Sequence, residues 1–244
     1  MRFLTFFLTF ITSVFAETFT IGAGPYFQTQ PYQGAKTITI ATPVVFFDNS
    51  IFYIRWSRAG VYFLGEKNED YAWGFSLVAQ PRPYGYKPND ATILEGMDKR
   101  NKAIEAGVAF SLKIEDAYLE IMALSDVTNH TDAYIIKSEL GFEYSLGNFT
   151  FYPSLLMVYQ SRQFTNYYYG VKHSEVTSNR NLYIPKSGID FGAQAYIEYP
   201  VTKNTLMLLN LRADKLSSQI TSSPLVNDSY IYSGLASLLY KFSY

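Results

Sequence analysis

The feature that most restricts how this chain can fold is a period-two alternation of apolar and polar residues, repeated in segments of about ten residues. Between Tyr134 and Leu146 the even positions are mostly large and apolar, whereas the odd positions include Lys137, Glu139 and Glu143. The pattern recurs in three further segments, which are Tyr71 to Gln80, Ala103 to Ile114 and Gly188 to Tyr199. No window shows a sustained helical period. The sequence therefore predicts β-strands with one apolar face and one polar face.

The connections between these segments distinguish a β-barrel from a β-sandwich, which alternates in the same way. Short connections alternate with long ones, and aromatic residues gather at strand ends. The short ones lie near Asp48, Glu115, Gly147 and Thr202, and the long ones span Pro81 to Lys102, Arg162 to Ser187 and Leu216 to Asp228. Lipid cannot satisfy an open sheet edge, so such a sheet must close. The sequence predicts an all-β fold, a single closed antiparallel transmembrane β-barrel with short periplasmic turns and long extracellular loops.

The strand count exposes a gap in this pattern. We mark eleven candidate strands, whereas barrels of this class have an even number. We expect twelve strands, with ten as the alternative. The missing strand is expected between Gln80 and Ala103, unless that segment climbs through the lumen as a plug. Within Ile51 to Leu64, Arg55 and Arg58 fall on opposite faces of one strand unless a β-bulge shifts the phase.

The N-terminal residues 1–16 have the features of a secretory signal peptide. Their apolar core, Phe3 to Phe15, is shorter than the roughly 20 residues that a spanning helix needs. Val14 and Ala16 provide the small-residue cleavage pattern. We expect residues 1–16 to be removed and residues 17–244 to form the barrel, with a retained membrane anchor as the less favoured alternative.

The chain ends on an alternating strand whose last apolar positions are aromatic. In a closed barrel this strand pairs with the first strand, and its apolar face meets lipid. A C-terminal aromatic residue on such a strand resembles the signal that the bacterial outer-membrane insertion machinery reads. The resemblance implies a membrane-insertion signal made of Tyr240, Phe242 and Tyr244.

Composition excludes several classes of function. Lys and Arg total 20 against 21 Asp and Glu, so no excess of positive charge is available to hold nucleic acid. The absence of Cys excludes disulfide scaffolds, thiol catalysis and thiolate metal sites. The 22 Tyr and 19 Phe residues suit the aromatic girdles of a transmembrane barrel.

Charged residues on the polar strand faces would line the barrel interior. The candidate lumen charges are Arg55, Lys113, Lys137, Glu139, Glu143, Asp190, Glu198 and Arg212, together with Glu105, Glu120 and Asp214. Charges of mixed sign indicate either an interior filled by ion pairs or a polar pore wall. Twelve strands lie between small filled barrels and open porins, so we favour a filled or narrowly gated lumen.

An enzymatic site has little support in the sequence. His130 and His173 fall in expected loops, and no partner that would orient either can be named. Glu139 and Glu143 share a strand face but lie roughly 13 Å apart at the normal strand rise, too far to share a proton. Metal binding has no supporting cluster. We therefore expect no catalytic residue, no metal and no cofactor.

The order of motifs resembles the MipA/OmpV family of outer-membrane proteins. The stretch "IGAGPYFQTQPYQGAK" is similar to the family's first strand and loop, and "ILEGMDKRNKAIEAGVAFSL" to its Gly-containing segment. "NYYYGVKHSEV" carries the family's loop motif, and "SSPLVNDSYIYSGLASLLYKF" its last loop and strand. The motif residues in the two loops are Tyr168, Tyr169, Gly170, Val171 and Pro224. Ser222 stands where the family usually has Asp.

This resemblance implies a non-enzymatic protein in the outer membrane of a Gram-negative bacterium, inserted by the outer-membrane insertion machinery. It implies a scaffold that links the membrane to a lytic transglycosylase and a penicillin-binding protein, with the periplasmic rim as the contact surface. One alternative function is a narrow or gated channel for small solutes or ions. A second is an adhesin or a surface barrel that binds a ligand through the Tyr-rich loop.

Overall fold

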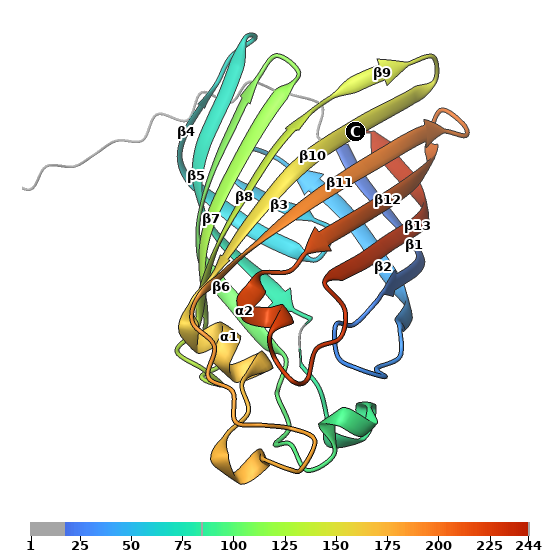
Figure 1. Cartoon of the computed structure of the whole chain (residues 1–244). Coiled ribbons are helices and arrows are strands. Elements are labelled where there is room, and N and C mark those ends of the chain that lie inside the picture. Colours follow the sequence, from blue (N-terminus) through green and yellow to red (C-terminus); the bar gives the residue numbers. More distant parts are fainter. Residues whose placement is uncertain (1–17, 84, 244) are drawn as a thin grey trace, which may run out of the picture.

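The computed structural model describes residues 18–83 and 85–243 and forms a barrel of antiparallel strands (Figure 1). The expected signal peptide and Tyr244 lie outside the described residues. The strands are β1 Thr18–Gln28, β2 Ile38–Asp48, β3 Phe52–Arg55, β4 Arg58–Lys67, β5 Tyr71–Arg82, β6 Ala103–Ile114, β7 Ala117–Asp126, β8 Tyr134–Phe142, β9 Tyr144–Leu146, β10 Phe149–Gln160, β11 Gly188–Pro200, β12 Thr205–Lys215 and β13 Tyr230–Ser243.

The sheet closes on itself because β1 pairs with β13 from Thr18↔Ser243 to Gln28↔Ser233. β8 and β9 are interrupted only at Glu143, and both pair with β10, so they form one strand of the wall. The described chain therefore builds twelve wall strands, as predicted. Closure gives each wall strand a neighbour on both sides along at least part of its length, which is what lipid requires of a spanning sheet.

The predicted location of the twelfth strand was wrong. β5 pairs directly with β6 up to Arg82↔Ala103, and the described part of the connection holds two short 3-10 helices, η1 Pro88–Asp90 and η2 Thr92–Leu94, at the loop end of the barrel rather than a strand or a lumen plug.

The extra strand comes from Ile51 to Leu64, which the alternation predicts as a single strand. It folds into a hairpin of β3 and β4, with Arg55 paired to Arg58. Both side chains consequently reach Glu120 in the lumen, and no bulge between the two arginines is needed. A register shift occurs later, between Tyr62 and Leu64. The sequence carries no signal for this turn, because Trp56 occupies it with φ of 58°, a conformation that favours Gly or Asn.

The two ends of the barrel differ in the way predicted. Short turns and the last described residue lie at one end, called here the turn end (Figure 1, top). Long connections gather at the other, the loop end, and carry α1 Arg162–Tyr169, η3 His173–Glu175 and α2 Ser218–Thr221. No helix among the described residues is long and apolar enough to cross a membrane.

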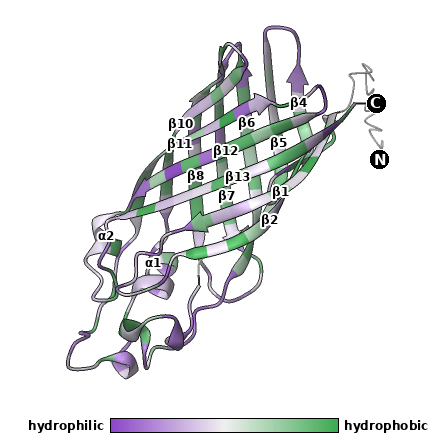
Figure 2. Ribbon diagram, turned by 90° about the vertical axis from the view of Figure 1, so that its right-hand side faces the viewer, coloured by the Kyte–Doolittle hydropathy of each residue, from purple (hydrophilic) through white to green (hydrophobic). Residues whose placement is uncertain are grey.

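Hydrophobic and hydrophilic positions alternate along the strands, and exposed apolar side chains cover the outside of the wall (Figure 2). Aromatic pairs mark the turn end, where the Phe149 and Tyr199 ring centroids are 4.9 Å apart. A second set, including Tyr134 with Tyr159, lies toward the loop end. Two residues of the expected insertion signal, Tyr240 and Phe242, pack ring to ring at 4.7 Å on this outer surface.

Within the β3–β4 hairpin, the ring of Tyr53 packs over Gly60 and fills the neighbouring interior. Tyr53 is 1% exposed, and its ring lies over Gly60 on the paired strand. A Cβ atom at Gly60 would come within 2.4 Å of that ring. The Tyr53 hydroxyl also lies 3.0 Å from the Ser76 hydroxyl on β5. The hairpin is thereby fixed to the rest of the wall.

Replacing Gly60 by Val should destabilise the barrel, because the added side chain displaces the Tyr53 ring. The expected loss in the free energy of unfolding is about 1–3 kcal/mol, measured by urea titration of the folded band on a heat-modifiability gel. Ala59→Val, on the exposed neighbouring position, is the control. Equal stability of the two variants would contradict this account of the hairpin.

Candidate functional site

Four long connections pack together into one layer over the loop end of the barrel. We call this layer the loop cap; it comprises residues 29–37, 83, 85–102, 161–187 and 216–229. One apolar cluster joins these connections. It contains Leu94 from the β5–β6 connection, and Ile220 and Leu225 from the β12–β13 connection, all fully buried. The same cluster includes wall residues such as Ile135. The loop cap is therefore continuous with the upper barrel interior.

The Tyr-rich helix α1 forms the centre of the loop cap. Ser161 caps the helix by accepting a hydrogen bond from the Phe164 N–H at 3.3 Å. Tyr168 and Tyr169 are buried, and the Tyr32 hydroxyl donates to the Tyr168 carbonyl at 3.2 Å. The Tyr32 and Tyr169 rings are stacked with their centroids 5.8 Å apart. These tyrosines hold the cap together and do not form an exposed patch.

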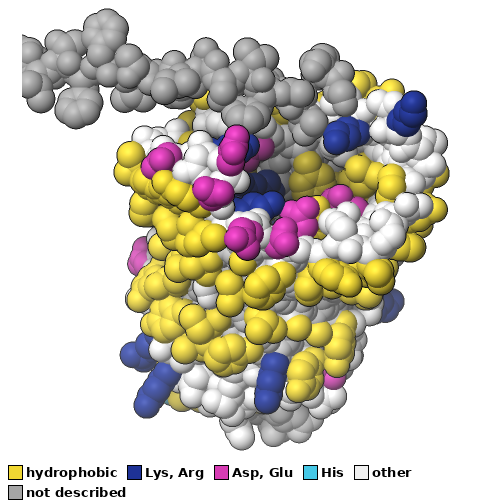
Figure 3. Space-filling view, turned by 90° about the horizontal axis from the view of Figure 1, so that it is seen from above, with side chains coloured by type: hydrophobic (Ala, Val, Ile, Leu, Met, Phe, Trp, Pro, Cys, Tyr) yellow, Lys and Arg dark blue, Asp and Glu magenta, His cyan; other side chains and the backbone are white. Residues whose placement is uncertain are grey.

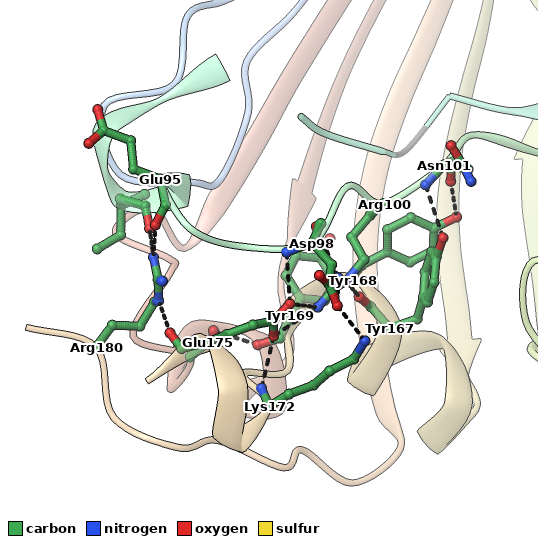
Figure 4. A network of polar contacts seen from close by, with 12 residues as sticks. Glu95, Asp98, Arg100, Asn101, Tyr167, Tyr168, Tyr169, Lys172, Glu175 and Arg180 are labelled. Carbon is green, nitrogen blue, oxygen red and sulfur yellow. Dashed lines mark hydrogen bonds and ion pairs between the residues drawn. The ribbon is translucent and has the colours of Figure 1, made fainter. Parts of the chain in front are cut away.

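A buried ion pair joins two of the cap's connections (Figure 4). Arg100 Nη2 lies 2.8 Å from Glu175 Oε1, and both side chains are 2% exposed. The backbone N–H groups of Asp98 and Lys172 also donate to the Glu175 carboxylate, each at 2.9 Å. The Tyr167 carbonyl accepts a hydrogen bond from Arg100 Nε at 2.6 Å. Each charge is thus surrounded by partners, which a buried ion pair requires.

The same surroundings shift the Glu175 carboxyl toward its charged form. Burial by itself raises its pKa, but the Lys172 and Asp98 N–H groups and the Arg100 guanidinium lower it, and the net pKa lies below the ordinary glutamate value. At the surface, the hydrogen bond from Lys172 lowers the pKa of Asp98. The loop cap is therefore built around ionised carboxylates.

A second buried ion pair joins two wall strands at their loop end and contacts the cap. Arg82, at the loop end of β5, donates from Nε to Glu105 Oε1 at 2.7 Å, and both side chains are 1% exposed. Gln80 donates to the other carboxylate oxygen at 2.7 Å. The Arg82 guanidinium also lies 4.9 Å from the centroid of the Phe164 ring in α1. The cap is thus fastened to the strands by charge as well as by apolar contact.

Deeper in the lumen, Glu120 bridges the two arginines of the β3–β4 hairpin. Its carboxylate contacts Arg58 and lies 3.0 Å from Arg55 Nη1. Arg55 Nη2 also lies 3.2 Å from Asp48 near the turn end. This cluster spans the interior between β2, β3, β4 and β7. Charged side chains of opposite sign therefore neutralise one another across this part of the lumen.

The other predicted lumen charges occupy the inner face in several smaller groups. Two carboxylates accept hydrogen bonds: Glu139 from the Ser154 and Gln194 side chains, and Asp190 from the Gln160 side chain and the Ser217 N–H. Two ion pairs also form, Arg212 with Asp214 and Lys113 with Glu143. Among the described residues, Lys137 and Glu198 make no hydrogen bond or ion pair. These charged side chains lie on the polar face of the wall, and they do not come together in one site.

Comparison with known proteins identifies the family. A family model described as "MltA-interacting protein MipA" matches residues 21–242. The chain belongs to the MipA family. It is an outer-membrane protein, because relatives carry that description and the fold is a transmembrane type of β-barrel.

Two relatives span nearly the whole of this MipA-family barrel. YiaT of Escherichia coli (strain K12) is 28% identical over 236 residues, 93% of each chain. The MltA-interacting protein of the same strain is 24% identical over 92% of this chain and 90% of its own. A solved structure of OmpT from Vibrio cholerae is similar with a TM-score of 0.43 and 9% identity, covering 95% of this chain and 99% of OmpT. None of these names denotes an enzyme.

The family-motif residues lie together in the loop cap. Gly170 ends α1, where its N–H donates to the Asn166 carbonyl at 3.1 Å, and a Cβ atom would come within 2.4 Å of that oxygen. Val171 is buried and bridges to Tyr183. Pro224 lies in the connection where the Ser223 hydroxyl donates to the Tyr169 carbonyl at 2.7 Å. The motif residues therefore link separate connections of the cap.

Two central residues, Arg82 and Arg100, were missed in the sequence. Arg82 continues the alternation of Tyr71 to Gln80 by one period, so extending that strand would have placed it in the lumen. Arg100 had no comparable signal, because its partner Glu175 is 75 residues away in the chain. Only the three-dimensional arrangement brings the two together.

Removing one charge of the Arg100–Glu175 pair should open the loop cap while leaving the strands folded. Glu175→Gln removes the buried counter-charge of Arg100, whose other carboxylate neighbour, the exposed Asp98, is 3.9 Å away; breaking a buried ion pair typically costs about 3–5 kcal/mol. The expected result is rapid tryptic cleavage within the cap of the membrane-embedded protein. Asp98→Asn is the control, because Asp98 is 61% exposed and its pair with Lys172 should contribute at most about 1 kcal/mol.

Cap stability should also depend on pH in a defined direction. The lowered pKa of Glu175 means that its stabilising contribution is present at neutral pH and is lost as the pH falls through that lowered value. Pepsin cleavage of the cap should therefore begin below about pH 4, the ordinary glutamate range. In Glu175→Gln this onset should vanish, with cleavage already fast at the highest pH that pepsin tolerates. A wild-type onset near neutral pH would contradict the assignment.

Proposed function

We propose that this MipA-family barrel is a non-enzymatic, non-conducting anchor whose periplasmic rim holds enzymes of murein hydrolysis and synthesis. The loop cap carries this proposal: it covers one end of the barrel with a packed apolar cluster and a buried ion pair, and it packs on a second buried ion pair at the loop end of the wall. A lumen covered in this way does not serve free diffusion. The surface left for a periplasmic partner is the turn end.

The rim at the turn end has an uneven distribution of charge. Exposed carboxylates on the β4–β5 and β6–β7 hairpins include Glu69, Asp70 and Asp116. Lys203 and Lys241 lie instead around a hollow of about 250 Å³ beside the β11–β12 turn. Figure 3 shows carboxylates gathered on one side of the mouth. Such a pattern favours a partner with a complementary charge distribution and a defined orientation.

The name of one kind of relative supports a partner of the MltA type. One relative is named for its interaction with MltA. We extend that interaction to this chain, with a lytic transglycosylase of the MltA type as the first partner and a penicillin-binding protein as the second. The adhesin alternative loses its main support, because Tyr168 and Tyr169 are buried inside the cap.

Reversing rim charges should weaken partner binding. In lipid nanodiscs, Glu69→Lys with Asp116→Lys should bind a purified MltA-type transglycosylase about tenfold more weakly, a change of roughly 1.4 kcal/mol. The matched control, Glu95→Lys with Asp132→Lys, reverses two exposed charges at the loop end and should bind like wild type. Binding would be measured by biolayer interferometry.

The same protein in a planar bilayer should give no discrete current steps, because the cap blocks the lumen. The rim assignment would be refuted if the wild-type protein did not bind the transglycosylase, or if both pairs of substitutions reduced binding equally. Ion-selective steps that change on Lys137→Glu would replace the anchor by the channel alternative.

A further inference from the structure

A hollow with a volume of about 440 Å³ lies on the lipid-facing side of the wall, over β11, β12 and β13; we call it the outer hollow. Ala195 pairs with Leu211, and Ala213 pairs with Tyr232. Leu211 and Tyr232 are exposed on the outer surface, and paired residues of an antiparallel ladder share a face. Ala193, which pairs with Ala213, also lines the hollow. The short alanine side chains therefore leave the space between the larger ones unfilled.

The Phe27 ring bounds the outer hollow on the side of β1. Phe27 pairs with Gly234 of β13, and a Cβ atom at that glycine would come within 2.5 Å of the ring. The ring therefore lies over Gly234, which is buried although it faces outward. Gly234 pairs in turn with Leu211 on β12. The outer hollow is thus an apolar recess with a defined side, not a flat stretch of wall.

Three basic residues stand at the loop end of the strands around the outer hollow. Lys215, the last residue of β12, lies two residues beyond Ala213 and therefore on the same outer face. It pairs with Phe191, which is exposed on the outer surface. Lys186 and Arg162 lie at the loop ends of the neighbouring strands β11 and β10 (Figure 1). All three basic side chains are exposed, so the loop-end margin of the hollow is positively charged.

The loop cap holds the backbone of Lys186 at this margin. The Lys186 N–H donates to Gln219 Oε1 at 2.8 Å, and its carbonyl accepts from the Thr165 hydroxyl at 2.7 Å. Gln219 belongs to α2 and Thr165 to α1. The cap therefore positions this charge through the backbone and leaves the side chain exposed.

The three cations are not neutralised by the protein. In the part of the chain that the structure describes, none of them forms an ion pair. The carboxylates of the same strands face the interior, where Asp190 accepts from Gln160 and Asp214 pairs with Arg212. Asp228, an exposed carboxylate just before β13, forms no ion pair either. Positive charge at this margin is therefore available to an anion from outside the chain.

We propose that the outer hollow and its lysines bind an anionic lipid of the outer leaflet. One acyl chain lies against Ala193 and Ala213, and the phosphate of the headgroup contacts Lys215 and Lys186. The apolar recess lies within the lipid-facing belt and the cations lie at its loop-end margin, which is the order of chain and headgroup in such a lipid. Lysine side chains extend from an apolar wall toward polar headgroups in this way. This lipid site goes beyond the rim function and does not depend on it.

Charge complementarity favours the lipid over two other occupants. A second copy of the chain, related by a two-fold axis along the membrane normal, would bring its own Lys215 to the same margin, and like charges disfavour that contact. Free inorganic phosphate would meet the lysines but would leave the apolar recess unoccupied. An anionic lipid matches both parts of the surface.

Native mass spectrometry of the detergent-solubilised protein, titrated with lipid, tests the proposal. Phosphatidic acid carries a phosphate monoester, whereas phosphatidylcholine with the same acyl chains carries no net charge. We expect one phosphatidic acid to bind at least about fivefold more tightly than phosphatidylcholine, the effect that a lysine near an anionic headgroup provides. Lys186→Gln with Lys215→Gln should abolish this preference. The matched control, Lys87→Gln with Lys99→Gln, removes two exposed lysines of the loop cap and should retain it.

The apolar part of the site is tested separately. Ala193→Leu with Ala213→Leu fills the outer hollow and should weaken the binding of both lipids about fivefold, because less of the acyl chain is buried. Ala79→Leu with Ala123→Leu, at exposed positions on β5 and β7, is the control and should bind like wild type. A heat-modifiability gel confirms that each variant is folded.

Equal affinity for the two lipids, or an equal loss in both lysine pairs, overturns the proposal. Unchanged lipid binding after the substitutions at Ala193 and Ala213 overturns it as well. Displacement of the lipid by excess inorganic phosphate would show a plain anion site, and a lipid-free dimer abolished by the same alanine substitutions would show an interface between copies; either result replaces the lipid. None of these outcomes bears on partner binding at the rim.

Discussion

Backbone hydrogen bonding in a medium without water is the constraint on which the rest of this structure depends. A strand in lipid must have a partner on each side, so the chain must close β13 onto β1. Closure produces a wall with one apolar and one polar face, and the polar faces then confront one another in a narrow interior. The interior ion pairs follow from this geometry: the buried pair of Glu105 with Arg82, and the partly buried contacts of Glu120 with Arg55 and Arg58, join charges that the closed wall brings together.

The loop cap is also held by apolar contacts and ion pairs, which here offset the cost of ordering long connections. Connections of 20 or more residues lose conformational entropy when they become ordered, and this cost must be offset by burial. The cap meets it with a cluster of apolar side chains and with Glu175, which collects hydrogen bonds from two separate connections. Because Arg82 contacts both Glu105 and the Phe164 ring, the cap and the wall stabilise each other. The lumen is covered by the same contacts that order the loops.

The alternation in sequence was sufficient to predict the barrel, the strand faces and the turn and loop ends, because lipid imposes the same rule on every strand. It failed at the β3–β4 hairpin for a local reason. Trp56 adopts a left-handed conformation without Gly, Asn or Asp to announce a turn. The cap's internal contacts could not be predicted either, since Arg100 and Glu175 meet only after the five strands β6 to β10, which separate them in the chain, have been placed. The sequence motifs identified the cap's residues without indicating their contacts.

The β3–β4 hairpin, which the sequence did not predict, also leaves residues 38–44 of β2 without a strand partner on the β3 side. A left-handed conformation costs a residue such as Trp roughly 1–2 kcal/mol, and the packing of the indole against Tyr26 and the interior cluster offsets it.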